Sequence, residues 1–322
     1  MAKIDIIGLG ALNADRLYHV ERLLDDGEAV VEDRGVFPGG SAANTIYGLA
    51  KLGIATAFIG AVGNDDEGRM ILGDFETAAV DTSRIRIKRE VRTGTTLCLS
   101  AAGKRAIYVM PGANDMLTSD DLNPAFIDQA DWLHVSSLAG GGQLQMLASL
   151  FKQVSARVRI SLSPGALYAA KGLEELEPLI SRSFVVFLNR SEIRTLTGQD
   201  FSRGADIMLE LGCRVVIVTL GKGVIISGAG RGNSAACYIR DAEGEYFIEG
   251  GNKSKAIDTT GAGDALAAGF LFGLIKGKTL LECGRLGVIA ARFCIGETGA
   301  RLGLPGAAEL SQAYSETFKE NP

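Results

Sequence analysis

The residues with the clearest chemical potential lie late in the chain, in the run Asp258-Thr-Thr-Gly-Ala-Gly-Asp264. The run directly precedes residues 266–275, which are apolar on every side and are therefore expected to form a buried helix. Small residues at a helix start leave backbone N–H groups free, and the helix dipole adds partial positive charge, so the segment suits a bound phosphate. A capping aspartate alone would not require Gly-Ala-Gly before it. The run predicts an anion-binding loop with Asp264 in the first turn of the helix.

A second glycine cluster, Pro38-Gly39-Gly40, opens the helical pattern over Ser41–Leu52. Glycines at this point allow the backbone to approach a polyhydroxy ligand closely, and Asn44 offers both a donor and an acceptor. An ordinary loop with a helix cap is the alternative interpretation of the same residues.

Two competing nucleotide motifs are incomplete. Gly277-Lys278-Thr279 lacks the first glycine of a P-loop, because Phe272 stands at that position. Gly8-Leu9-Gly10 follows a predicted strand, but Asn13 replaces the third glycine of the dinucleotide fingerprint. We therefore expect a nucleotide to bind the carboxyl-terminal half of the chain, and we disfavour an NAD-dependent dehydrogenase.

Short β-rich runs alternate with helical patterns along most of the chain. The expected strands are residues 4–8, 55–62, 132–135, 158–162, 185–188 and 215–220, and the expected helices after Ser41–Leu52 are residues 67–79, 143–154, 173–181, 191–196 and 204–211. Repeated βα units of this kind predict an α/β fold with a doubly wound, mostly parallel sheet and helices on both faces.

Residues 15–37 and 84–110 break this rhythm, because charged and apolar residues alternate there. Arg84-Ile-Arg-Ile-Lys88 is a strict period-two pattern, which is typical of a half-exposed strand. We expect the two segments to pair into a small β-sheet that projects as a lid over a cleft; two solvated hairpins are the alternative. An open sheet edge invites a second copy, so a homodimer through the lid is also expected.

Composition excludes several classes of function. The chain has 322 residues and a net charge of −5, which argues against nucleic acid or an anionic membrane as the partner. No apolar run reaches the length of a membrane span. The five cysteines show no CxxC spacing and the two histidines lie far apart, so we expect a reduced, cytoplasmic protein without a zinc site.

The two glycine motifs together resemble the ribokinase-like (PfkB) carbohydrate kinase family, over nearly the whole chain. Further segments that are similar to the family follow in order: Asn13-x-Asp15, Gly60-Ala-Val-Gly63-Asn-Asp65 with Gly68, Pro111-Gly-Ala-Asn114, Asn189-x-x-Glu192 and Thr219-Leu-Gly221. The resemblance implies one kinase domain over residues 1–322 that carries the lid, and transfer of a phosphoryl group from ATP to a hydroxyl of a small carbohydrate.

The resemblance also implies a role for each matched residue. Asp264 is the expected general base, and the backbone of Gly261, Ala262 and Gly263 completes the catalytic loop. Asn13, Asp15, Gly39, Gly40 and Asn44 are the expected contacts to the sugar. The nucleotide is expected at Asn189, Thr219, Gly221, Gly261 and Gly263. Asn189 and Glu192 are expected to organise Mg²⁺ through water, and Asp258 and Thr260 to hold an activating K⁺.

The acceptor is less determined than the reaction. Ser41 stands where ribokinases usually have lysine, which argues against ribose specificity, and we expect a free sugar in general. A nucleoside is the alternative, with Tyr18, Phe37 and Tyr108 as aromatic lid residues. A sugar phosphate would need Arg92, Lys104 or Arg105 to reach in from the lid. A non-catalytic sugar or nucleotide sensor is disfavoured, because Asp264, Asn189 and Glu192 are all present.

Overall fold

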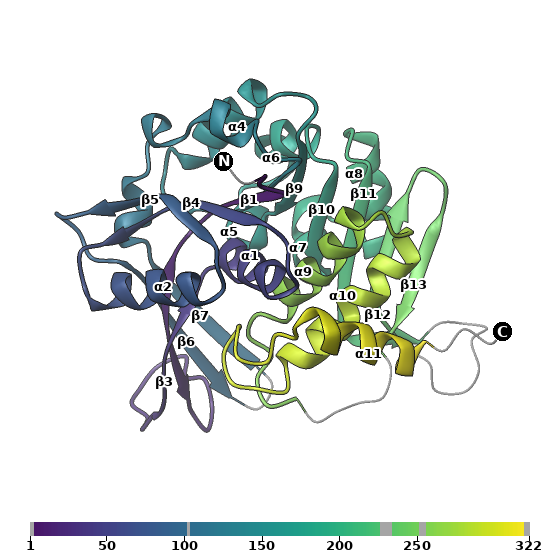
Figure 1. The fold of residues 1–322 in the computed structure, drawn as a ribbon. Helices are drawn as coiled ribbons and strands as arrows, with labels where there is room; N and C mark the ends of the chain where they lie inside the picture. Colours follow the sequence, from purple (N-terminus) through teal and green to yellow (C-terminus); the bar gives the residue numbers. More distant parts are fainter. Residues whose placement is uncertain (1–2, 102–103, 226–233, 251–255, 319–322) are drawn as a thin grey trace.

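The computed structural model describes residues 3–101, 104–225, 234–250 and 256–318, and a nine-stranded sheet forms the centre of this part of the chain (Figure 1). Its strands are β1 (Ile6–Leu9), β4 (Thr56–Gly63), β5 (Asp81–Lys88), β8 (Trp132–Ser136), β9 (Arg159–Ser163), β10 (Val185–Asn189), β11 (Val215–Ile225), β12 (Ser234–Asp241) and β13 (Glu245–Glu249). The order is β13-β12-β11-β10-β9-β8-β1-β4-β5, parallel from β11 to β5 and antiparallel at β12 and β13.

Helices cover both faces of this sheet. One face packs against α1 (Ser41–Lys51), α2 (Asp66–Thr77), α9 (Ala262–Ile275) and α10 (Leu280–Cys294), and α11 (Ala307–Thr317) lies on α10. The other face packs against α3 (Pro124–Ile127), α4 (Gln143–Gln153), α5 (Gly165–Ala169), α6 (Leu173–Ile180), α7 (Arg190–Thr197) and α8 (Phe201–Glu210). Neighbouring Ile6 and Ile7 are both fully buried, one on each face, so the inner strands read as continuous apolar runs. The expected doubly wound α/β fold is confirmed.

A smaller four-stranded sheet projects from this body, at the lower left of Figure 1. Its order is β3 (Glu32–Gly39), β2 (Asn13–His19), β6 (Gly94–Ala101), β7 (Lys104–Met110). The second small sheet was expected, but its boundary at residue 84 is wrong. Residues 81–88 are β5, which pairs with β4 at the edge of the main sheet. Ile85 packs on the core there, while Ile87, two residues on and on the same face, is already exposed. The alternation of charged and apolar residue types is the same as that expected of a lid strand. Periodicity shows that a strand is half-exposed, not which strand is its partner.

Two hydrogen-bond networks fix the lid sheet to the body. The Asp65 carboxylate caps α2 through the Gly68 N–H at 2.9 Å and also accepts the Thr93 N–H at 2.8 Å, just before β6. The Thr93 hydroxyl bonds back to Asp65 and accepts the Gly63 N–H at 2.9 Å. The segment Gly63–Gly68 therefore works as the joint between β4, α2 and the lid.

A short 3₁₀ turn, η1 (Gly112–Met116), follows β7, and a second one, η2 (Ser119–Asp121), comes after it. The second network centres on Asn114 of η1. Its Oδ1 accepts the Leu12 N–H at 2.8 Å, and its Nδ2 donates to Asn13 Oδ1 at 2.9 Å. The bend between β1 and β2 is thereby tied to the end of the lid.

In the described residues, no helix is long and apolar enough to span a bilayer.

Candidate active site

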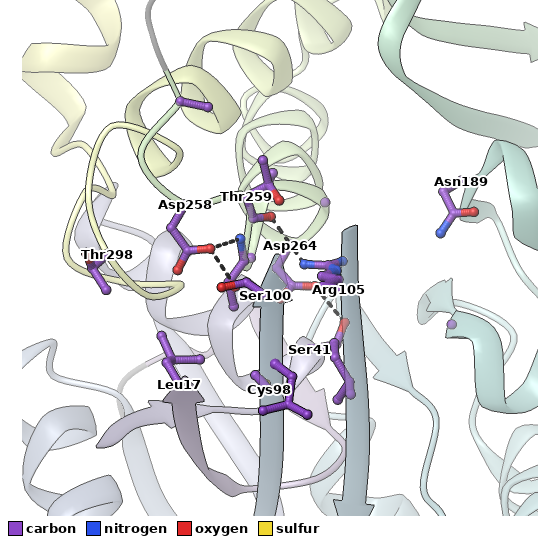
Figure 2. A pocket seen from close by; sticks show the side chains of 18 of the residues that line it. Leu17, Ser41, Cys98, Ser100, Arg105, Asn189, Asp258, Thr259, Asp264 and Thr298 are labelled. Atoms are coloured by element: carbon purple, nitrogen blue, oxygen red, sulfur yellow. Dashed lines mark hydrogen bonds between the residues drawn. The ribbon is translucent and has the colours of Figure 1, made fainter. Parts of the chain in front are cut away.

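A cavity of about 770 Å³ lies between the lid sheet, the carboxyl ends of β10 and β11, and the start of α9 (Figure 2). Its walls include Ser41 from α1, Arg105 from β7, Asn189 from β10 and the whole loop 256–264. The carboxyl edge of a parallel sheet is where ligands bind in doubly wound folds, so the position of the cavity agrees with the topology.

Asp264 lies in the first turn of α9, as expected. Its Oδ1 accepts a hydrogen bond from the Ser41 hydroxyl at 2.7 Å, and its Oδ2 accepts one from Asn44 Nδ2 at 2.9 Å. The Thr45 hydroxyl reaches the Asp264 backbone carbonyl at 3.3 Å. The two glycine motifs of the sequence therefore meet at this single carboxylate, which joins the starts of α1 and α9.

Burial raises the pKa of Asp264 to about 6, against the opposing effect of its hydrogen bonds from Asn44 and Ser41. Positive charge on Arg105 and Arg301 also acts to lower it. The group is therefore ionised at neutral pH and yet more basic than an ordinary aspartate. A carboxylate with these properties can accept a proton from a bound hydroxyl.

The backbone before Asp264 has the geometry expected of an anion cradle, although its binding of phosphate stays a prediction. Gly261 caps α9 with φ of 75°, in the left-handed region, and a Cβ there would lie 2.4 Å from the Ala300 Cβ. The N–H groups of Gly261, Gly263 and Asp264 donate to no acceptor within the described chain, whereas that of Ala262 reaches the Thr259 carbonyl at 3.3 Å. Gly263 lines the cavity, and a Cβ there would meet nothing within 4 Å.

Asp15 and Asn13 are buried at the base of the lid. Asp15 is 8% exposed, and its Oδ1 accepts the Thr96 hydroxyl from the neighbouring strand at 2.5 Å. Burial raises the pKa of Asp15 to about 6, although the Thr96 bond and the Arg301 charge oppose the change. A side chain at Gly39 would collide with the Asp15 carboxylate, with the nearest oxygen only 2.1 Å from its Cβ.

The second glycine cluster has an internal structural explanation. Gly40 has φ of 103° and lies so close to the Ala11 carbonyl that a Cβ would be 2.0 Å from it. The Asn44 amide donates to Asp264 and accepts from Arg301, so both its ends are engaged within the protein. The expected contacts of Gly39, Gly40 and Asn44 with a sugar remain predictions.

The third group of expected residues lies at the far side of the cavity. Asn189 caps α7 by accepting the N–H groups of Ser191 and Glu192, and the Glu192 carboxylate accepts the Asn189 N–H at 2.8 Å. Burial raises the pKa of Glu192. Asn189 and Thr219 are register partners on β10 and β11, and Gly221 follows with φ of 62°. The geometry is that of a capping box, and a role toward metal or nucleotide stays a prediction.

Asp258 links the loop before α9 to the segment between α10 and α11. Its Oδ1 accepts the Thr260 N–H at 2.9 Å and the Thr260 hydroxyl at 2.8 Å, and its Oδ2 accepts the Gly299 N–H at 2.9 Å. In the residues that the structure describes, no cluster of three or more His, Cys, Asp or Glu could hold a metal ion. Any cation at Asp258 would therefore depend on neutral oxygen ligands.

Sequence reasoning did not place two arginines beside the Asp264 carboxylate. Arg105, expected only as a possible contact to a sugar phosphate, extends from the lid strand β7 toward Ser41 and Asp264, and its guanidinium lies 3.5 Å from the Thr259 carbonyl (Figure 2). Arg301 lies behind Asn44, buried in the body. An arginine between Gly-Ala and Leu-Gly carries no sequence signal for burial, and only the fold reveals it.

The comparisons with known proteins agree with the geometry. Residues 2–307 match the pfkB family carbohydrate kinase model. The chain is 38% identical over 263 residues to a protein described as an uncharacterized sugar kinase from Archaeoglobus fulgidus, which covers 81% of this chain and 100% of that one. It is 30% identical over 320 residues to a ribokinase of Staphylococcus aureus, covering 95% and 98%.

Solved structures share the fold. The Arabidopsis thaliana ribokinase complexed with ribose and ATP superposes with a TM-score of 0.79 at 23% identity, covering 97% of this chain and 98% of that one. The adenosine kinase from Sinorhizobium meliloti gives a TM-score of 0.79 at 24% identity, covering 97% and 100%. Because the family model matches residues 2–307 of its 322 residues, this chain belongs to the pfkB family of carbohydrate kinases.

Proposed function

We propose that this protein transfers the γ-phosphoryl group of ATP to a hydroxyl of a free sugar, with Asp264 as the general base. One observation carries the proposal: a half-buried carboxylate, held by Ser41 and Asn44, opens on a cavity beside backbone N–H groups at the start of α9 that have no acceptor in the described chain. The cavity continues to Asn189 and Thr219, which leaves room for a nucleotide on that side.

In the proposed reaction the acceptor hydroxyl lies between Asp15 and Asp264. Asp264 takes the hydroxyl proton while the sugar oxygen bonds to the γ-phosphorus and the bond to the β–γ bridging oxygen breaks, which releases ADP. The N–H groups of Gly261, Gly263 and Asp264 stabilise the charge on the transferred phosphoryl, and one such donor is typically worth ~3 kcal/mol. Phosphoryl transfer has a loose transition state and needs little early deprotonation, so a base with a pKa near 6 is adequate.

The lid favours a sugar over a nucleoside as acceptor. Of the three aromatic residues that could stack on a base, only Tyr18 lines the cavity. Phe37 lies against Gly299 instead, and Tyr108 is 59% exposed away from the lining. Relatives of this chain bear the names ribokinase, probable fructokinase and ATP-dependent ribose-1-phosphate kinase, so free and phosphorylated sugars both belong in the substrate screen.

The screen measures ADP release with pentoses, hexoses, sugar phosphates and nucleosides. We expect turnover with at least one free sugar, and we expect Asp264→Asn to lower kcat for that sugar by roughly 10²–10⁴ with little change in ATP affinity. Asp120→Asn, at an exposed carboxylate, is the matched control. Near-normal kcat in Asp264→Asn would remove the base assignment, and turnover of nucleosides alone would replace the acceptor class.

The same variant reports on stability. Because the folded-state pKa of Asp264 is raised from 3.8 to about 6, the folded protein favours the protonated form, and its stability falls as pH rises between these two values. The asparagine substitution removes that cost, so we expect Asp264→Asn to melt higher than wild type above pH 7, with the gain shrinking toward pH 4. A thermal melt at several pH values checks this sign.

Substitutions at Gly263 and Gly261 test phosphate binding and fold stability separately. Gly263→Ala places a methyl group in open space beside the anion cradle, so we expect an unchanged or higher melting temperature and at least tenfold lower kcat/KM. Gly261→Ala must adopt positive φ and collide with Ala300, so we expect it to destabilise the fold. Full activity in Gly263→Ala would place the phosphoryl group elsewhere.

Magnesium is proposed to bind through water near Glu192, where it would neutralise phosphate charge. Glu192 Oε2 is occupied by the capping box, and its second oxygen is available for a hydrated cation. Glu192→Gln keeps the box but removes the charge, so we expect a several-fold higher Mg²⁺ concentration at half-maximal rate with α7 intact. Glu309→Gln is the control, because the Glu309 carboxylate likewise accepts an N-cap N–H, that of Gly306 at the start of α11, and it should leave the Mg²⁺ dependence unchanged.

A monovalent cation is proposed near Asp258 and Thr260. A single carboxylate with neutral oxygens around it suits K⁺ better than a divalent ion. We expect a higher rate in K⁺ than in Na⁺ at equal ionic strength, and we expect Asp258→Asn to abolish the difference. Equal rates of the wild-type protein in the two salts contradict this proposal.

A further inference from the structure

Arg301 is unusual among the charged residues of this protein. It lies in the segment between α10 and α11 and is 5% exposed, and no other lysine or arginine of the described residues is buried to this degree. Burying a guanidinium is costly unless its nitrogens find acceptors and its charge is balanced. Each of the three nitrogens of Arg301 has an acceptor, and Asp74 supplies an opposite charge.

Three elements supply the acceptors. One terminal nitrogen of Arg301 donates to Asp74 Oδ2 of α2 at 2.5 Å, and the other donates to the Gly39 carbonyl at 3.3 Å. Its Nε donates to Asn44 Oδ1 of α1 at 2.9 Å. The guanidinium also lies over two aromatic rings, with its carbon 5.2 Å from the centroid of Tyr47 and 5.1 Å from that of Phe75.

The contact with Asn44 decides which way its amide points. Arginine carries only donors, so the atom facing its Nε must be the amide oxygen. The amide nitrogen of Asn44 then faces Asp264 and donates to Oδ2 at 2.9 Å. With the amide reversed, its oxygen would face the carboxylate and the hydrogen bond would be lost. Arg301 and the Asp264 carboxylate therefore favour the same orientation of the Asn44 amide, and Arg301 holds the amide from the side away from the carboxylate.

The charge of Arg301 acts on the same site. The charged groups that face Asp264 are Arg301 from behind α1, Arg105 from β7 and Asp15 from β2, and the Cys294 thiol of α10 also faces it. Arg301 lowers the pKa of both Asp15 and Asp264, against the effect of burial. Asp74 of α2 pairs with the Nη1 end of the guanidinium, whereas the Nε side faces Asn44 and, beyond it, Asp264.

We propose that Arg301 is a positioning residue for phosphoryl transfer, which orients the Asn44 amide toward Asp264 and places a fixed positive charge behind the two acidic residues of the site. The inference rests on the proposed function, since it treats Asp264 as the base. Arg301 does not line the cavity, so a search for substrate contacts alone would not identify its effect on the reaction.

Arg301→Gln removes the charge, and Asp74→Asn is its matched control, because it loosens the tether to α2 but leaves Arg301 facing Asn44. Aspartate ¹³Cγ NMR without substrate follows the titration of Asp264, assigned with the Asp264→Asn variant. We expect its midpoint to rise by about one pH unit in Arg301→Gln and to stay within a few tenths of wild type in Asp74→Asn. Equal midpoints in wild type and Arg301→Gln overturn the proposal.

Kinetics supply the second readout. We expect Arg301→Gln to lower kcat about 10- to 100-fold with an unchanged KM for ATP, and to shift the acidic limb of the pH profile upward with the NMR midpoint. Asp74→Asn should lower the melting temperature with kcat within about twofold of wild type. Equal loss of kcat in both variants shows a purely structural role and also overturns the proposal.

Arg301→Lys keeps the charge if the glutamine variant does not fold. A single ammonium cannot reach Asp74, Asn44 and Gly39 together, so we expect a lower kcat and a nearly wild-type midpoint, and wild-type kcat in this variant overturns the orienting role. The NMR titration needs no acceptor. A protein that turns over no acceptor would therefore refute the proposed function, while the effect of Arg301 on Asp264 would still be measured.

Discussion

The burial of the Asp264 carboxylate is the constraint on which the site depends. A negative charge removed from water needs donors of fixed geometry, and these come from Ser41 and Asn44 at the start of α1. Asn44 in turn is held by Arg301, whose charge pairs with Asp74 of α2. The geometry of the carboxylate that we propose as the base is thus set by the packing of α1 against α9 in the core.

Burial makes the Asp264 carboxylate more basic, and it also makes the charged form of this group less stable. The same loss of hydration that raises the pKa of Asp264 and Asp15 also disfavours their charged forms. Arg301 from the core and Arg105 from the lid oppose this effect from two sides. The arginine in the core is held by three hydrogen bonds, whereas the lid arginine has one hydrogen bond to the described part of the body, to the Thr259 carbonyl at 3.5 Å, so the balance of charge depends partly on where the lid lies.

Local patterns predicted the fold well where the chemistry is local. The glycine run before Asp264, the apolar helix after it and the alternating βα units all followed from spacing and residue type. The partner of β5 did not, because period-two alternation is identical in a lid strand and a sheet edge. Nor did the role of Arg301, which bonds to a residue 257 positions away and whose burial no neighbouring residue announces. The assigned contacts to sugar, metal and nucleotide remain inferences from resemblance.

The lid is assembled from two stretches of chain that are separated by α1, β4, α2 and β5, and each stretch is anchored by its own network, at Asp65 and at Asn114. It is therefore not a module that recombination could exchange in one piece. Transplanting the acceptor preference of a relative would require both halves and both anchors at once, so specificity in this scaffold is expected to diverge by single substitutions within the lid, with the joints left in place.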